Sequence, residues 1–96
     1  MDLINLLREK RAAILDTARL HGARNVRIFG SVARGDFDEK SDLDLLVEME
    51  PDRSLLDHAS LLLDLEKLLG CKVDVVSEKG IKTRIRERVL KEARPL

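Results

Sequence analysis

The chain has 96 residues, with 18 Lys plus Arg balanced by 18 Asp plus Glu. Apolar residues make up 44% and charged residues 38%, which predicts one folded domain over residues 1–96 rather than a disordered tail. Zero net charge gives no general attraction for phosphate backbones, and only two aromatic residues could stack on bases. We therefore expect no direct nucleic-acid ligand.

The cellular setting follows from what the sequence lacks. Cys71 is the lone cysteine and cannot form an internal disulfide, and the N-terminus begins with a charged, helix-patterned segment rather than an apolar signal region. No stretch approaches the roughly 18 consecutive apolar residues of a membrane span. These features predict a cytoplasmic protein without a membrane partner.

Hydrophobic periodicity predicts the first elements in chain order. Asp2 to His21 repeats apolar residues at helical spacing and meets Gly22, a helix stop. A strand from Asn25 to Phe29 then enters a turn at Gly30-Ser31, with a short helical turn after it, and a second strand runs from Leu43 to Met49.

The second half continues the alternation of helix and strand. Ser54 and Asp57 form a capping box before a leucine-rich helix that stops at Gly70. A third strand covers residues 72–77 and a last helix covers 81–93, ended by Pro95. This order predicts an α/β fold, a sheet with helices packed against it.

Three acidic residues form the candidate site. Asp42 and Asp44 are two residues apart, so their side chains leave an extended segment on one face, with Cα atoms about 6.5 Å apart. Two carboxylates on one face repel each other unless a cation such as magnesium or manganese neutralises them. Asp74 lies within the Val-rich third strand, where an unpaired charge is hard to explain unless the neighbouring strand carries Asp42 and Asp44.

Adjacent strands would bring the three carboxylates together. Such a site could hold two metal ions about 3.5 to 4 Å apart for an in-line displacement, with Asp74 deprotonating or orienting the nucleophile. Gly30 and Ser31, at a strand-to-helix turn, could approach phosphate oxygens, and Arg34 could add charge-assisted hydrogen bonds. Alternatively, Arg34 pairs with Asp36 or Asp38 at the surface.

Other residues receive plainer interpretations. The leucines between Leu55 and Leu69 predict core, and any exposed surplus would mark an interface. The basic last helix indicates a solvated face, with an acidic partner or a nucleotide phosphate as the alternative. Polar loop residues and isolated polar side chains are assigned no chemistry: Asp36, Asp38, Glu39, His21, His58 and Cys71.

Three motifs together resemble a known family. The runs Gly30-Ser31-Val32-Ala33-Arg34-Gly35, Ser41-Asp42-Leu43-Asp44-Leu45 and Val73-Asp74-Val75-Val76 resemble the signature of polymerase-beta-like nucleotidyltransferases. The chain is most similar to their minimal single-domain prokaryotic branch, the MNT antitoxins of MNT/HEPN pairs, and the resemblance covers nearly the whole chain.

The resemblance implies a nucleotidyltransferase fold with a small mixed sheet of three to four strands. It also implies ATP as the nucleotide, two magnesium ions on Asp42, Asp44 and Asp74, and triphosphate contacts from Gly30 and Ser31. By this resemblance the chain is an antitoxin that attaches AMP to a tyrosine hydroxyl of a HEPN-type ribonuclease toxin, which AMPylation silences. Whether the chain acts as a monomer or within an oligomer is left open.

Two other functions compete with this one. A catalytically silent, nucleotide-binding antitoxin would neutralise its toxin by direct contact alone. A metal-dependent phosphohydrolase would consume nucleotide without any acceptor, but the sequence offers no obvious water-positioning residue.

Overall fold

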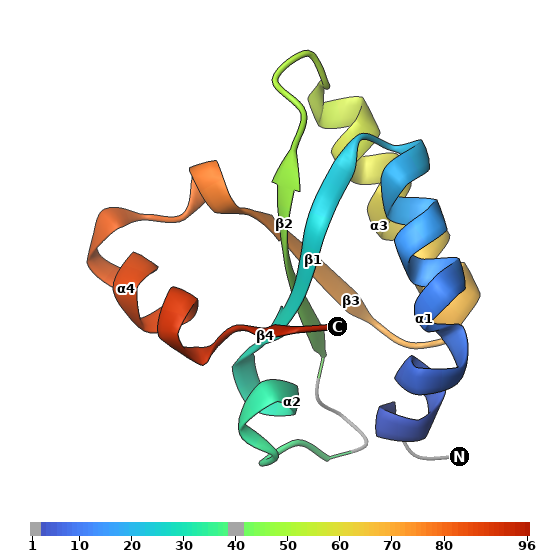
Figure 1. Cartoon of the computed structure of the whole chain (residues 1–96), viewed down its shortest axis with the longest axis vertical. Helices are drawn as coiled ribbons and strands as arrows, with labels where there is room; N and C mark the ends of the chain where they lie inside the picture. The colour runs from blue at the N-terminus through green and yellow to red at the C-terminus, as the bar shows by residue number, and fades with distance from the viewer. Residues whose placement is uncertain (1–2, 39–41) are drawn as a thin grey trace.

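A computed structural model of the chain shows a four-stranded sheet with helices on both faces (Figure 1). It describes residues 3–38 and 42–96. The predicted helix start at Asp2, and Glu39 and Ser41 of the loop before the second strand, lie outside the described residues. No described helix is both long enough and apolar enough to cross a membrane.

The elements follow one another in an alternating order. They are α1 (Leu3–Leu20), β1 (Ala23–Phe29), α2 (Gly30–Arg34), β2 (Leu43–Met49), α3 (Leu55–Leu69), β3 (Val73–Ser77), the 3-10 turn η1 (Glu78–Gly80), α4 (Thr83–Glu92) and β4 (Arg94–Pro95).

The sheet is mixed, as the family resemblance implied. Its strand order is β3-β2-β1-β4. The β2 and β3 strands run parallel, joined by the crossover through α3, whereas β1 is antiparallel to both β2 and β4. This topology puts β2, the most apolar strand, in an interior position of the sheet, where both of its faces can be covered.

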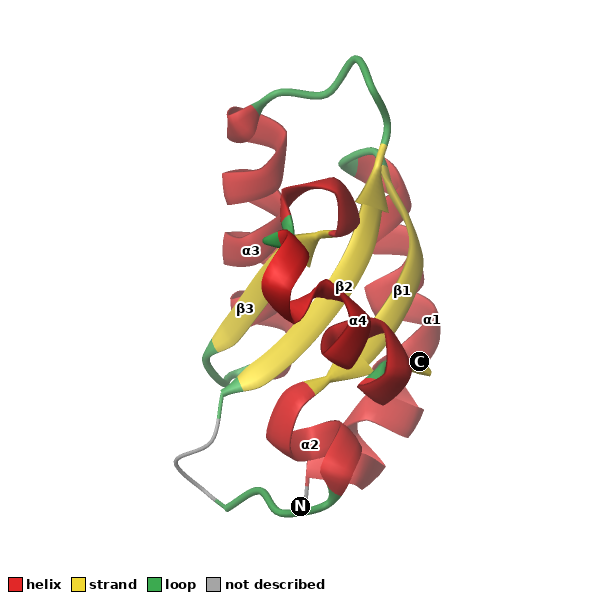
Figure 2. Cartoon of the chain, turned by 90° about the vertical axis from the view of Figure 1, so that its left-hand side faces the viewer, coloured by secondary structure: helices red, strands yellow, loops and turns green. Residues whose placement is uncertain are grey.

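Residue alternation along β2 separates two cores. Leu43, Leu45 and Val47 point to the face covered by α1 and α3 and belong to the larger core, while Leu46 points to the opposite face. There it packs with Ile81 and Val89 beneath α4. Figure 2 shows α4 in front of the sheet, with α1 and α3 behind it.

Local sequence signals explain where α3 begins and ends. The Ser54 hydroxyl accepts a hydrogen bond from the Leu56 amide at 3.2 Å, and the Asp57 carboxylate accepts one from the Ser54 amide at 3.0 Å. At the other end Gly70 adopts the left-handed conformation, with φ of 68°. The predicted capping box and stop are both confirmed.

The C-terminal prediction was wrong in two respects. The last helix starts at Thr83 rather than Ile81, because η1 turns the chain first, and Ile81 packs in the smaller core. Pro95 does more than end the helix: Arg94 and Pro95 form the edge strand β4 beside Ile28 and Arg27 of β1. Proline is compatible with an edge strand because it has no N–H group, and the side of an edge strand that faces solvent needs no hydrogen bond to another strand.

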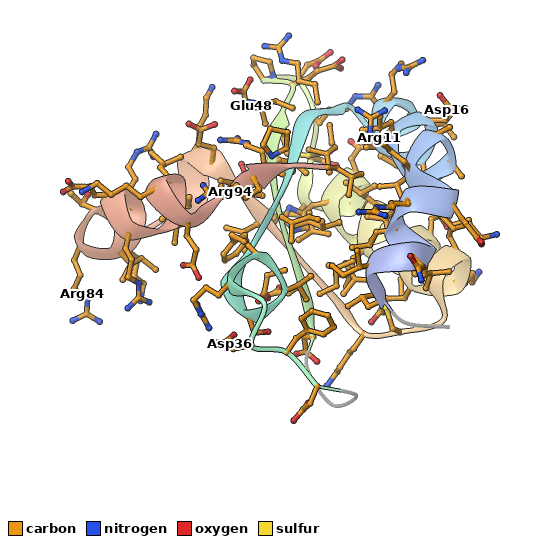
Figure 3. All side chains as sticks on the ribbon, turned by 60° about the horizontal axis from the view of Figure 1, so that its bottom comes forward. Arg11, Asp16, Asp36, Glu48, Arg84 and Arg94 are labelled. Atoms are coloured by element: carbon orange, nitrogen blue, oxygen red, sulfur yellow. The ribbon has the colours of Figure 1, made fainter. Side chains whose placement is uncertain are left out.

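The leucine prediction for α3 was right for one face only. Leu61, Leu65 and Leu69 are buried, whereas Leu55 and Leu56 are 87% and 78% exposed. Leu63 of α3 is also exposed, and the other exposed large apolar side chains on the described surface are Ile4, Leu20, Ile85 and Leu90. On α4 the side chains of Arg84, Arg88 and Lys91 are exposed as expected, and Arg84 points away from the fold (Figure 3). Arg86 is half-buried instead and donates a hydrogen bond to the Glu78 carbonyl at 2.9 Å.

Candidate active site

The two strands that carry the candidate carboxylates are neighbours. In the parallel pairing of β2 with β3, Asp44 lies directly opposite Asp74, and Leu43 opposite Val73. The prediction that these strands adjoin is therefore confirmed. Because the sheet alternates its side chains, Asp44 leaves the face opposite Leu43 and Leu45, which is the face that carries α4.

The three carboxylates differ in exposure. Asp42 immediately precedes β2 and is exposed, Asp44 is half-buried, and Asp74 is exposed. The Val-rich strand does not enclose the Asp74 charge, because β3 is an edge strand and Asp74 is exposed on it. The link between Asp74 and the site rests instead on its register with Asp44.

Asp44 lies in the electrostatic field of the other two acids. Partial burial raises the pKa of Asp44 above its ordinary value, and the charges of Asp74 and then Asp42 raise it further. The Arg34 guanidinium acts in the opposite direction. A group whose ionised form is disfavoured by two neighbouring carboxylates is a favourable place for a cation.

The end of β1 lies beside Asp44, on the side of β2 away from β3. Phe29 pairs with Asp44 in the β1–β2 ladder, so Gly30, the first residue of α2, follows beside that carboxylate. Gly30 has φ of 74°, a left-handed conformation. A Cβ atom at Gly30 would collide with Asp44 Oδ2, and would lie 3.1 Å from its Cγ. Glycine is thus required here both for its backbone conformation and for the space it leaves to Asp44.

Ser31 and Arg34 lie on the five-residue helix α2 that starts at Gly30. Ser31 is half-buried, and its carbonyl accepts a hydrogen bond from the Asp36 amide at 3.1 Å. Arg34 Nε donates to Asp36 Oδ2 at 3.1 Å, and Arg34 Nη1 donates to Glu92 Oε1 of α4. The surface pairing with Asp36 that the sequence offered as an alternative is therefore present, together with a contact to Glu92 that the sequence reasoning missed.

Hard carboxylate oxygens in register are the donor set that magnesium or manganese prefers. Within residues 3–38 and 42–96, no three His, Cys, Asp or Glu side chains already stand grouped as metal ligands. Without a cation the three carboxylates repel one another. Binding of one ion by all three would therefore require these side chains to come closer together than they are here.

The histidines and the cysteine lie elsewhere. His21 Nε2, in the turn after α1, is 2.7 Å from Asp64 Oδ2 of α3, and His58 Nε2 is 2.7 Å from the carbonyl of Val75. Burial raises the pKa of the Cys71 thiol, which disfavours the reactive thiolate. These histidine contacts join separate elements of the fold, and the absence of chemistry at these residues stays a prediction.

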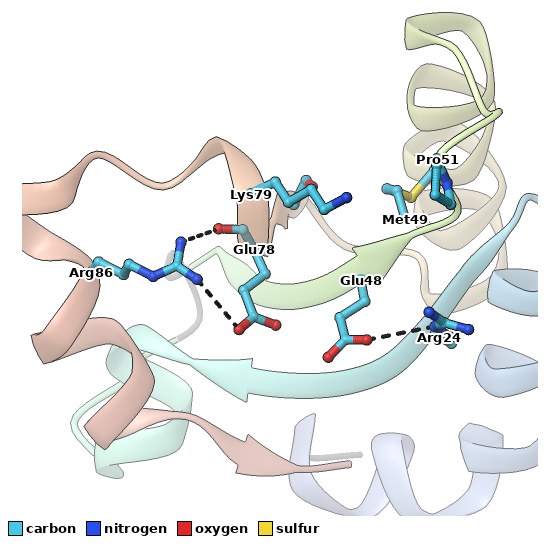
Figure 4. A pocket seen from close by; sticks show the side chains of 8 residues that line it. Arg24, Glu48, Met49, Pro51, Glu78, Lys79 and Arg86 are labelled. Carbon is cyan, nitrogen blue, oxygen red and sulfur yellow. Dashed lines mark hydrogen bonds and ion pairs between the residues drawn. The ribbon is translucent and has the colours of Figure 1, made fainter.

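A pocket of about 260 Å³ lies at the other end of the β2 strand, around Glu48 (Figure 4). Its charged side chains largely pair with one another: Arg24 Nε lies 3.5 Å from Glu48 Oε2, and Arg86 Nη2 lies 3.7 Å from Glu78 Oε1. Glu48 is four residues along the strand from Asp44. This pocket therefore does not include the carboxylate site.

Comparison with known sequences identifies relatives. The pattern of the nucleotidyltransferase domain matches residues 11–96. A protein of Methanocaldococcus jannaschii, provisionally named a protein adenylyltransferase, is 39% identical over 87 residues, covering 91% of this chain and 94% of that protein. The protein adenylyltransferase MntA of Thermococcus cleftensis is 44% identical over 71 residues, covering 74% of this chain and 72% of that protein.

Solved structures agree with these relatives. A protein provisionally described as a minimal nucleotidyltransferase superposes with a TM-score of 0.89 and 59% identity, covering 100% of this chain and 97% of that chain. A toxin–antitoxin crystallised with AMP-PNP has a TM-score of 0.75 and 21% identity, covering 88% of this chain and 69% of that chain. At that identity the second likeness shows a shared fold alone.

Proposed function

This chain belongs to the nucleotidyltransferase domain family, and from that membership we propose that it transfers AMP from ATP to a hydroxyl group of a partner protein. The observation that carries the proposal is the register of Asp44 with Asp74, beside a glycine whose missing Cβ leaves room for the Asp44 carboxylate. Relatives named protein adenylyltransferase support protein as the acceptor. The AMP-PNP in a structural neighbour supports an adenine nucleotide.

The proposed reaction is a single displacement at the α-phosphorus of ATP. The acceptor oxygen attacks the α-phosphorus of ATP, the bond from that phosphorus to the bridging oxygen breaks, and pyrophosphate leaves with the electron pair. In our proposal the Asp74 carboxylate receives or orients the hydroxyl proton, since Asp74 is the most open of the strand-borne acids. Gly30 and Ser31 hold the triphosphate, and Arg34 adds a charge-assisted contact.

We propose Asp42, Asp44 and Asp74 as the residues that hold two magnesium ions, with manganese as a substitute. Bound there, the ions would neutralise the carboxylates and stabilise charge on the entering and leaving oxygens. The raised pKa of Asp44 supports this assignment, because a cation would relieve the repulsion that causes part of that shift.

The proposed acceptor is a tyrosine of a HEPN-type toxin, which makes this chain an antitoxin. The given sequence contains no tyrosine, which agrees with an acceptor on another molecule. Two structural neighbours are toxin–antitoxins, which motivates the choice of partner. The competing function is neutralisation by contact, with the nucleotide site acting only as a sensor.

The test is transfer of label from α-phosphate-labelled ATP, with magnesium, to the protein product of the adjacent gene. The native chain is compared with Asp42→Asn and Asp44→Asn, which remove one charge each while keeping side-chain size. We expect label on the partner only with the native chain. Neutralisation of the partner by both variants, without any label transfer by the native chain, would favour action by contact and reject the transferase proposal.

A further inference from the structure

The C-terminal helix α4 contacts the short helix α2 through the side chain of Glu92. Glu92, in the last turn of α4, accepts a hydrogen bond from Arg34 of α2, 58 residues earlier in the chain. The Glu92 side chain is 16% exposed and the Arg34 side chain 51%, so the acid is the enclosed partner and the guanidinium is the open one. The contact thus holds the Arg34 guanidinium from the side of Glu92, while the Arg34 side chain stays about half exposed to solvent.

The Arg34 guanidinium is held at two of its three nitrogen atoms. Nε donates to Asp36 and Nη1 donates to Glu92, whereas no described residue accepts a hydrogen bond from Nη2. A planar guanidinium held by two carboxylates is restricted in orientation, so it loses less freedom when its remaining donors bind an anion.

Arg34 and Glu92 also lie within electrostatic reach of the metal-binding candidates. The Arg34 charge lowers the pKa of Asp44 and the Glu92 charge raises it, although burial and the neighbouring aspartates act more strongly. Helix α2 carries both Arg34 and Ser31, so the same short element links the triphosphate turn to this guanidinium.

Helical spacing explains how Glu92 comes to face inward on a helix rich in cations. Glu92 is three residues after Val89, which is buried against Leu46, so both side chains lie on the face that packs on the sheet. Glu87, by contrast, is 85% exposed and pairs at 3.4 Å with Lys91, which is 78% exposed. The two glutamates of α4 therefore have different surroundings.

From this geometry we propose that Glu92 is a positioning residue that holds Arg34 at the triphosphate site, so that docking of α4 helps to set the affinity for ATP. The inference rests on the proposed function for its ligand. Glu92 itself does not touch the nucleotide. Its effect is exerted through the orientation of Arg34.

The test measures binding of AMP-PNP with magnesium by calorimetry, which requires no acceptor protein. Glu92→Gln should weaken binding about 3- to 10-fold, the scale of one partly exposed charge-assisted contact. In steady-state transfer it should raise KM for ATP and leave kcat nearly unchanged. The matched control Glu87→Gln removes the same charge from the same helix and should change neither quantity.

A double-mutant cycle separates positioning from a general effect of charge. In an Arg34→Gln background, Glu92→Gln should cause no further loss, because the residue it positions is gone. An equal loss in both backgrounds, unchanged binding, or tighter binding on Glu92→Gln would overturn the inference. If Glu92→Gln unfolded, Arg34→Lys, which keeps the charge but lacks the planar guanidinium fork, should show the same weakening, and native affinity in that variant would refute the inference.

The inference about Glu92 can fail separately from the proposed function. A native chain that binds no AMP-PNP would overturn both that function and this inference. Normal AMP-PNP binding by both the native chain and Glu92→Gln would overturn only the role of Glu92.

Discussion

Replacing Gly30 by alanine tests whether the turn after β1 exists to accommodate Asp44. The backbone at Gly30 has φ of 74°, and an L-residue in this left-handed region costs about 1–2 kcal/mol of stability. The new Cβ would also collide with Asp44 Oδ2. That carboxylate oxygen is the end of a side chain that can rotate, so the collision adds little to the loss of stability but displaces the acid.

We therefore expect Gly30→Ala to fold, to lose about 1–2 kcal/mol in urea denaturation, and to lose about a hundredfold or more in transfer rate, the penalty for moving a catalytic group by about 1 Å. Its affinity for manganese should fall as well, because Asp44 is a proposed ligand. Titration of manganese by electron paramagnetic resonance measures that affinity.

Gly70→Ala is the matched control. Gly70 has φ of 68° at the end of α3, and a Cβ there would meet nothing within 4 Å. The two variants share the backbone strain but differ in the contact with Asp44. The reasoning is refuted if Gly70→Ala loses as much transfer activity as Gly30→Ala, or if Gly30→Ala keeps the native rate.

Three other perturbations have defined outcomes. Because the native pKa of Asp44 lies above the ordinary 3.8, the native state holds its proton more tightly than the unfolded state, and stability falls as pH rises through the window above 3.8. Asp44→Asn should therefore stabilise the metal-free chain at pH 7 and give no advantage below pH 3.8 in urea unfolding; destabilisation at pH 7 would contradict this. Glu78 lies 2.8 Å from Arg27, and their side chains are 23% and 14% exposed. Glu78→Gln should therefore lower the free energy of unfolding by about 1–3 kcal/mol. Glu87→Gln, in the exposed pair with Lys91, should lower it by less than about 0.5 kcal/mol. Ser54→Ala removes the N-cap of α3 and should lower the free energy of unfolding by about 1 kcal/mol, and an unchanged denaturation midpoint would argue against that cap.

Local sequence signals predicted most of the fold. The bounds of β2 were predicted from its apolar run, and the α3 helix from its capping box and its terminal glycine. The strand β4 could not be read from periodicity, because it has two residues, one of them proline, and exists through pairing with β1. Its formation depends on tertiary structure rather than on local preference.

The candidate site was also predictable in part from local sequence patterns. Two acids at spacing two, and an acid in a nearby strand, indicated a shared site, and the parallel pairing brings Asp44 and Asp74 into register. The sequence reasoning missed Glu92 because α4 is rich in Lys and Arg, and its interpretation rested on those cations. A count of helical spacing from Val89 would have placed it on the inner face, but its partner Arg34 lies on another helix and follows only from the folded structure.

The most direct test of the central claim is a crystal structure of the chain with AMP-PNP and manganese, in which anomalous scattering locates the metal. We predict two manganese ions about 4 Å apart bound by Asp42, Asp44 and Asp74, with the triphosphate against Gly30 and Ser31. Nucleotide bound at the Glu48 end of the sheet, or manganese absent from these three carboxylates in crystals that contain the nucleotide, would contradict the account.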